Sequence, residues 1–140
     1  MHDIIWGTHE DEIGQSIGRW YFSKINKPNY DTLSLFCAMG ILKDKTLRGA
    51  VIFTHYNHSS IEIHYYGYKG AVTIKTWREA LRYAFKGLKV NRLTAMTNRG
   101  NRKLLKALPR LGFKYEASLK RYYGIDKSQD AIVHVMFSED

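Results

Sequence analysis

The sequence predicts a single α/β (α+β) domain in which helices flank a mixed, mostly antiparallel sheet of six or seven strands. Three strand-like segments follow one another over residues 33–67 with only short polar turns between them, which is typical of an antiparallel meander. A strand, a strongly periodic helical segment and another strand then occupy residues 61–97, which indicates a sheet covered by helices. The 140 residues contain no repeat and no linker, so we expect one domain over residues 1–140.

An amphipathic helix is the first element that we expect. Thr8 followed by Asp11 has the spacing of a helix N-cap with an acidic residue in the first turn. Apolar side chains recur at helical spacing from Ile13 to Tyr21, and the helix should end before Pro28.

Strands and helices alternate through the rest of the chain. The three meander strands are LSLFCAMGIL, LRGAVIFTHY and SIEIHYYG. Thr76 and Glu79 have the spacing of a capping box, and an apolar stripe from Trp77 to Leu88 predicts a helix behind them. The remaining elements are the strand RLTAMT, a helix over residues 104–111, and the strands FKYEASLKRYY and AIVHVMF. The expected order is one helix, three strands, a helix, a strand, a helix and two strands.

Both ends of the short helix carry a sequence signal. Asn101 fits the N-cap position, because its side-chain oxygen can accept a hydrogen bond from an unpaired backbone N–H. Gly112 fits the position just past the helix, where a left-handed backbone costs glycine little, and Phe113 then begins the next strand.

The composition limits partners and location. A formal net charge of +9 favours anionic partners such as nucleic acid, an acidic substrate or a phosphorylated cofactor. The single cysteine, Cys37, cannot form an internal disulfide and fits a reducing compartment. The chain has no apolar run of membrane-spanning length and no signal-peptide pattern, so we expect a cytoplasmic protein without a membrane partner.

A set of spaced motifs in residues 77–137 carries a family resemblance. It comprises Tyr83-Ala84-Phe85, the strand from Arg92 to Ala95, Asn101, Leu111-Gly112-Phe113, and Glu116 ahead of Leu119-Lys120-Arg121. This pattern resembles the second half of the GNAT acyl-CoA N-acyltransferases, in the branch that includes the ribosomal-protein alanine N-acetyltransferases. The resemblance implies a sheet that splays between IEIHYY and RLTAMT. It also implies direct transfer of an acetyl group from acetyl-CoA to an amine on a protein, small molecule or nucleobase. We expect a monomer or homodimer.

The resemblance also implies a binding site for acetyl-CoA. The family holds the pyrophosphate on backbone amides where a strand turns into the long helix, which here is the loop Gly67–Thr76. The usual R/Q-x-x-G-x-G/A signature is not intact in this loop. The residues predicted to bind the cofactor are Tyr66, Lys69, Gly70, Ala71, Val72, Thr73, Asn98, Asn101 and Lys103.

Candidate acid and base residues come from two segments. Strand alternation places Glu62, His64 and Tyr66 on one face, so Glu62 or His64 can serve as the general base for the amine. Many relatives use a tyrosine of the last helix to protonate the leaving thiolate, but Leu108 occupies that position here. Tyr123, and after it Tyr122, are the substitutes that we predict, provided that their strand faces the thioester. The histidines lack metal-ligand spacing, so we expect no metal.

A second class of protein also fits the charge. Basic and aromatic residues interleave in FKYEASLKRYYG and YFSKINKPNY, as in modules that track phosphates and stack bases. The alternatives are therefore a basic nucleic-acid-binding module, or a GNAT-like enzyme that modifies DNA bases.

Overall fold

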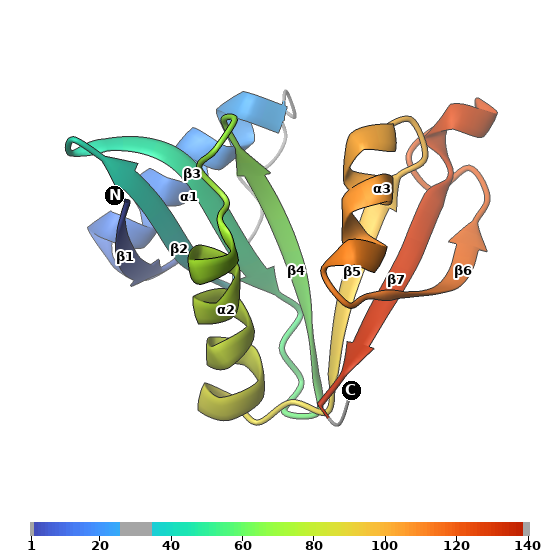
Figure 1. Cartoon of the computed structure of the whole chain (residues 1–140). Helices are drawn as coiled ribbons and strands as arrows, with labels where there is room; N and C mark the ends of the chain where they lie inside the picture. Colours follow the sequence, from blue (N-terminus) through green and yellow to red (C-terminus); the bar gives the residue numbers. More distant parts are fainter. Residues whose placement is uncertain (1, 26–34, 139–140) are drawn as a thin grey trace.

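The computed structural model describes residues 2–25 and 35–138, and it has helices on both faces of one sheet (Figure 1). The strands are β1 (Asp3–Thr8), β2 (Phe36–Lys43), β3 (Thr46–Thr54), β4 (Ser60–Gly67), β5 (Arg92–Asn98), β6 (Lys114–Leu119) and β7 (Ala131–Phe137). The α-helices are α1 (Glu12–Ile25), α2 (Ile74–Arg82) and α3 (Arg102–Arg110). A π-helical turn, η2 (Tyr83–Gly87), extends α2, and a short 3-10 turn, η3 (Lys127–Gln129), precedes β7.

The sheet has the strand order β1-β2-β3-β4-β5-β7-β6. Neighbouring strands are antiparallel except β4 and β5, which are parallel. The prediction of a mixed, mostly antiparallel sheet of six or seven strands is therefore confirmed.

The sheet splays between β4 and β5. These strands pair over four residues only, from Ser60 opposite Arg92 to Ile63 opposite Ala95, although β4 continues to Gly67 and β5 to Asn98. Figure 1 shows the two halves of the sheet moving apart beyond this short paired segment. The predicted splay is confirmed.

Two apolar clusters hold the helices on the sheet. On one face, Trp77 of α2 and Leu108 of α3 pack in a cluster with residues of β2 to β5 and β7. On the other face, Ile17 and Tyr21 of α1 pack against Ala38, Ala50 and Ile52. The two faces of the splayed sheet are thus covered by different helices.

The start of the chain corrects one expectation, because β1 precedes α1. Asp3–Thr8 is an edge strand, and among the described strands it pairs only with β2. Its short apolar run therefore forms a strand because of this pairing and not because of a periodic sequence pattern. Asp11, not Thr8, caps α1: its Oδ1 accepts the N–H of Gly14 at 2.7 Å. Ile13, expected on the buried face, is 51% exposed. Residues 26–34, which include Pro28 and the end of YFSKINKPNY, lie outside the described residues.

The cap of α2 lies one turn earlier than predicted. Thr73 is the N-cap and Thr76 is the third helical residue, and each side chain bonds the backbone N–H of the other. Both threonines suit a cap, and the turn that follows β4, in which Ala71 N–H donates to Tyr68 C=O at 2.9 Å, precedes the one that is used. The predicted pairing of Thr76 with Glu79 is therefore wrong.

The last hairpin is shorter than predicted. β6 ends at Leu119, so Tyr122 and Tyr123 do not lie on a strand. Arg121 has a φ of 58°, which turns the backbone away from the sheet, and Asp130 Oδ1 accepts the Arg121 N–H at 2.9 Å.

Within the described ranges, no helix is long and apolar enough to cross a membrane.

Candidate active site

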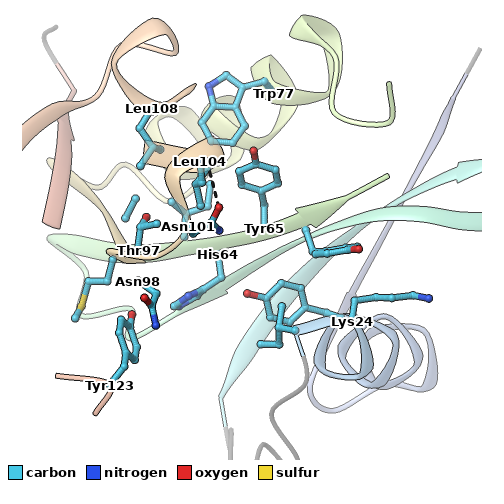
Figure 2. A pocket seen from close by; sticks show the side chains of 16 residues that line it. Lys24, His64, Tyr65, Trp77, Thr97, Asn98, Asn101, Leu104, Leu108 and Tyr123 are labelled. Atoms are coloured by element: carbon cyan, nitrogen blue, oxygen red, sulfur yellow. Dashed lines mark hydrogen bonds between the residues drawn. The ribbon is translucent and has the colours of Figure 1, made fainter. Parts of the chain in front are cut away.

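A cavity of about 360 Å³ occupies the gap between β4 and β5, and we call it the splay pocket. Its walls come from β4 and β5, from all three α-helices, and from Tyr123 in the loop between β6 and β7. Figure 2 shows Trp77, Tyr65, Leu104 and Leu108 on one side, and His64, Asn98, Tyr123 and Lys24 on the other. The first set belongs to the face of α2 and α3, and Lys24 comes from α1 on the opposite face. The pocket therefore connects the two faces of the sheet.

Buried polar atoms in this pocket lack partners. Among the described side chains, three buried polar atoms form no hydrogen bond: Trp77 Nε1, Thr97 Oγ1 and His134 Nδ1. Trp77 and Thr97 both line the splay pocket. An unpaired buried polar group costs on the order of 1–3 kcal/mol, so two at one cavity are typical of a site built for a polar ligand.

The diverging strands add backbone groups to the pocket. Ile63 and Ala95 are the last residues paired across the gap, and each strand continues for three or four residues beyond them. Strand residues direct N–H and C=O groups alternately to either side, so the segments beyond Ile63 and Ala95 present such groups to the gap. An extended ligand carrying amides can bond them as an added strand would.

His64 belongs to a hydrogen-bonded cluster on the α1 face. Its Nε2 lies 2.9 Å from Thr54 Oγ1, which in turn lies 3.1 Å from His55 Nδ1. Glu62 Oε2 lies 3.0 Å from His55 Nδ1 and 3.7 Å from His64 Nε2. His64 lines the pocket, whereas the His55 side chain is 68% exposed. The predicted pairing of Glu62 and His64 on one face is confirmed, and Thr54 and His55 extend it to the surface.

The environment of His64 determines its charge. Burial disfavours the imidazolium, and the nearby His55 acts in the same direction; together they lower the pKa of His64 to about 4. His64 is therefore neutral near pH 7 and can accept a proton.

The loop from Gly67 to Thr76 leads from β4 into α2. Gly70 has a φ of 82°, and a Cβ built there would meet no atom within 4 Å, so the backbone is open at this point. Ala71 instead points inward and is 1% exposed. The N–H groups of Ile74 and Lys75 lie in the first turn of α2 and have no intrahelical acceptor. Trp77 in the same turn lines the splay pocket, so this helix N-terminus borders the pocket.

The two asparagines of the NRGN segment both line the pocket and both shape the chain. Asn101 Oδ1 accepts the N–H of Leu104 at 3.3 Å, which confirms the predicted cap of α3 (Figure 2). Asn98 Oδ1 accepts the N–H of Gly100 at 2.9 Å. Because both oxygens are used in this way, the side-chain NH₂ groups are the parts that can donate to a ligand. Gly112, at the other end of α3, has a φ of 101° as predicted.

The two candidate acids, Tyr123 and Tyr122, differ in their position relative to the pocket. Tyr123 lines the pocket, whereas Tyr122 is 57% exposed and packs edge-on against Tyr123 at 5.0 Å. Tyr65 also lines the pocket, and burial raises the pKa of its phenol, which therefore stays protonated.

The remaining predicted residues lie as follows. Tyr66 lines the pocket, while Lys69, Val72, Thr73 and Lys103 do not border it. Their roles toward a cofactor stay predictions.

Sequence reasoning missed Trp77, Thr97 and Lys24 as pocket residues. Alternation predicts that Thr97 shares a face with Leu93 and Ala95, and the helical stripe includes Trp77. Both signals indicate that these residues are buried. They border a pocket only because β4 and β5 separate next to them. In the part of the chain that the structure describes, no group of three or more His, Cys, Asp or Glu side chains is arranged to hold a metal.

Solved structures identify this architecture. Mutant forms of the spermidine/spermine N-acetyltransferase SpeG from Vibrio cholerae superpose with a TM-score of 0.71 at 19% identity, over 98% of this chain and 96% of that one. A GNAT-family acetyltransferase from Bacillus anthracis gives 0.61 at 20% identity, over 74% and 67% of the two chains. The ribosomal-protein-S5-alanine acetyltransferase from Vibrio fischeri gives 0.62 at 21% identity, over 84% and 69%.

The chain has the fold of the GNAT acetyltransferases, and the predicted resemblance is confirmed at the level of the fold. No model of a known protein family matches the chain, and no curated protein matches its sequence.

Proposed function

We propose that this protein is an acetyl-CoA-dependent N-acetyltransferase that moves the acetyl group directly to an amine. The observation that carries the proposal is the splay pocket, which joins the two faces of the sheet and holds two unpartnered buried polar atoms. A reaction between two substrates needs such a passage, because each substrate can enter from its own face and meet the other between β4 and β5.

The α2–α3 face suits the thiol arm of the cofactor. Acetyl-CoA supplies an activated thioester. Trp77 Nε1 can donate a hydrogen bond, Thr97 Oγ1 can donate or accept one, and the edges of β4 and β5 offer backbone groups. The open backbone at Gly70 and the N-terminus of α2 provide donors for phosphates. These groups match the amides and phosphates of an acyl-CoA.

The α1 face suits the amine. His64 is neutral and can take the proton that the amine loses as it attacks. A pKa of about 4 makes His64 a transient holder of that proton. Thr54 and His55 offer a route to solvent, and the carboxylate of Glu62 stabilises positive charge along it.

Direct transfer agrees with the position of the one cysteine. Cys37 does not border the splay pocket, and burial raises the pKa of its thiol. The Cys37 thiol is therefore a poor nucleophile, and it lies outside the splay pocket. Tyr123 is the group that we assign to protonate the leaving thiolate.

Binding of acetyl-CoA tests the proposal. Titration calorimetry with acetyl-CoA and CoA, followed by an amine panel with detection of free thiol, should show binding and amine-dependent turnover. A nucleic-acid-binding module would instead bind an oligonucleotide with a steep salt dependence and leave acetyl-CoA unbound. The second result would overturn the proposal.

A further inference from the structure

A second hollow, which we call the basic groove, lies beside the loop between β6 and β7. It has a volume of about 430 Å³ and is lined by Arg99, Lys120, Arg121, Ile125, Lys127 and Asp130. Four of these six side chains are cationic and one is anionic. The groove therefore attracts anions.

Asp130 fixes the shape of the basic groove. The residue is 5% exposed; its Oδ1 accepts the N–H of Arg121 at 2.9 Å and its Oδ2 lies 3.3 Å from Arg99 Nη1. Arg99 N–H also donates to Asp130 C=O at 2.8 Å, and Gly100 N–H donates to Ser128 C=O at 3.0 Å. The turn after β5 and the loop before β7 are thus joined, so the groove exists before a ligand arrives.

The basic groove adjoins the acceptor side of the splay pocket through the chain itself. Arg99 directly follows Asn98, and Arg121 precedes Tyr123 by two residues, which is a backbone distance of at most about 7 Å. Asn98 and Tyr123 both line the splay pocket, on the side of His64 in Figure 2. An acceptor whose amine is at His64 can therefore place another part of itself in the basic groove.

Among the described residues, the lining of the splay pocket supplies no carboxylate for a polycation, and the nearest one, Glu62, lies against His55 and His64. Of the described residues that line it, none is Asp or Glu, and Lys24 is its only fully charged side chain. An acceptor with several positive charges would lose hydration there and would find only the Glu62 carboxylate, which His55 already holds, as a countercharge. The described lining therefore offers little charge complementarity to a polyamine, although solved structures with a similar fold are named as spermidine/spermine N-acetyltransferases.

We infer that the acceptor amine is carried by an anionic molecule, whose phosphate or carboxylate binds in the basic groove while its amine reaches His64. This inference rests on the proposed function and names the substrate class of the same site. The cations of the basic groove select the anion, and the lack of a carboxylate among the described lining residues of the splay pocket selects against polyamines.

Matched acceptors test the inference. The panel has four hexapeptide amides with a free N-terminus and glutamate, phosphoserine, glutamine or lysine at the central positions. Ethanolamine, O-phosphoethanolamine and spermidine complete it. We expect kcat/KM to be about tenfold or more higher for the anionic member of each pair, and the advantage to shrink as salt rises. Comparing kcat/KM for the glutamate peptide and the phosphoserine peptide shows whether the groove prefers a carboxylate or a phosphate.

A double variant locates the effect. Lys120→Gln with Lys127→Gln removes two groove charges that form no ion pair with any described residue, unlike Arg99. Lys43→Gln with Lys86→Gln removes the same charge from exposed positions on the β2–β3 hairpin and η2. The ratio of kcat/KM for the glutamate peptide to that for the glutamine peptide should fall about tenfold in the first variant and persist in the second.

The outcomes separate the two proposals. If acetyl-CoA does not bind, the proposed function fails and the inference fails with it. If acetyl-CoA binds, the inference alone is overturned by equal or better use of neutral or cationic amines, or by no turnover of any anionic amine. It is also overturned by a preference that survives in Lys120→Gln/Lys127→Gln, or by a variant that weakens CoA binding instead, which would assign the groove to a cofactor phosphate.

Discussion

The hydroxyl oxygen of Thr54 lies 2.9 Å from Nε2 of His64 and links this pocket histidine to the exposed His55. Thr54 is 2% exposed, so the link runs through the interior between neighbouring strands. A histidine held in this way has one nitrogen committed to the protein, which leaves the other for a substrate.

Replacing His64 tests the base. In His64→Gln, kcat should fall by roughly 10²–10⁴-fold while the Kd of acetyl-CoA stays unchanged, because a general base contributes to the chemical step. Thr54→Val should lower kcat less, and Glu62→Gln should act in the same direction. Full activity in both His64→Gln and Glu62→Gln would mean that the amine loses its proton to solvent.

The pH dependence of stability gives an independent test of His64. Its pKa is about 4 in the folded protein against 6.5 as the reference, so the unfolded chain binds more protons between these values. Stability should be fully present above about pH 6.5 and should decline as the pH falls toward about 4. Between about pH 7 and about pH 5 the loss from His64 is about 2 kcal/mol.

Urea unfolding of His64→Gln measures this contribution. Burial also lowers the pKa of His134, so the variant should retain the part of the slope that comes from that residue, and the difference between wild type and variant isolates His64. His58→Asn, at an exposed turn, should keep the whole slope. An unchanged slope in His64→Gln would contradict the expected protonation.

The sequence predicts features that depend on one helix or strand alone, such as the face on which a side chain lies and the residues that cap a helix. Alternation along β4 assigns Glu62 and His64 to one face, and the caps of α3 follow from Asn101 and Gly112. The sequence did not predict β1, because this edge strand forms through its pairing with β2 and has no strand pattern of its own.

Tertiary arrangement decides the candidate site. Trp77 and Thr97 lie twenty positions apart on a helix and a strand, and their sequence patterns indicate only that both are buried. They line a common pocket because β4 and β5 separate beyond Ile63 and Ala95. Tyr123 likewise lines the pocket through a loop whose turn depends on Asp130.

The Thr97 hydroxyl should lower the stability of the free protein and strengthen the binding of acetyl-CoA. Its hydroxyl is buried without a partner, so Thr97→Val should raise the free energy of unfolding by about 1 kcal/mol and weaken acetyl-CoA binding. Thr94→Val is the matched control on the other face of β5: it loses a 2.9 Å bond from Arg92 Nε and should lower stability without changing the Kd. Denaturant unfolding and calorimetry measure both quantities. Weaker folding of Thr97→Val with unchanged binding would contradict a ligand role.

Gly70 should tolerate a side chain in the free protein better than in the complex. Its φ of 82° makes Gly70→Val strained, whereas Gly70→Asn suits a left-handed backbone and separates strain from obstruction. Both variants should bind acetyl-CoA at least tenfold more weakly if a phosphate approaches this backbone. Gly87→Ala, on η2, should leave the Kd unchanged. Unaltered CoA affinity in a folded Gly70→Asn protein would exclude this loop from the binding site.

Tyr123 and Tyr122 form a matched pair for testing the acid. The centroids of the two rings lie 5.0 Å apart, but of the two only Tyr123 borders the splay pocket. Tyr123→Phe should lower kcat by about 10²-fold with little change in acetyl-CoA affinity or thermal midpoint, because the hydroxyl would act only as the thiolate leaves. Tyr122→Phe should keep the wild-type kcat. A solvent isotope effect on kcat that changes in Tyr123→Phe alone would distinguish proton transfer from a loss of packing. Equal turnover in both variants would transfer the role to water or to Tyr65, whose phenol lies in the same pocket and is kept protonated by burial.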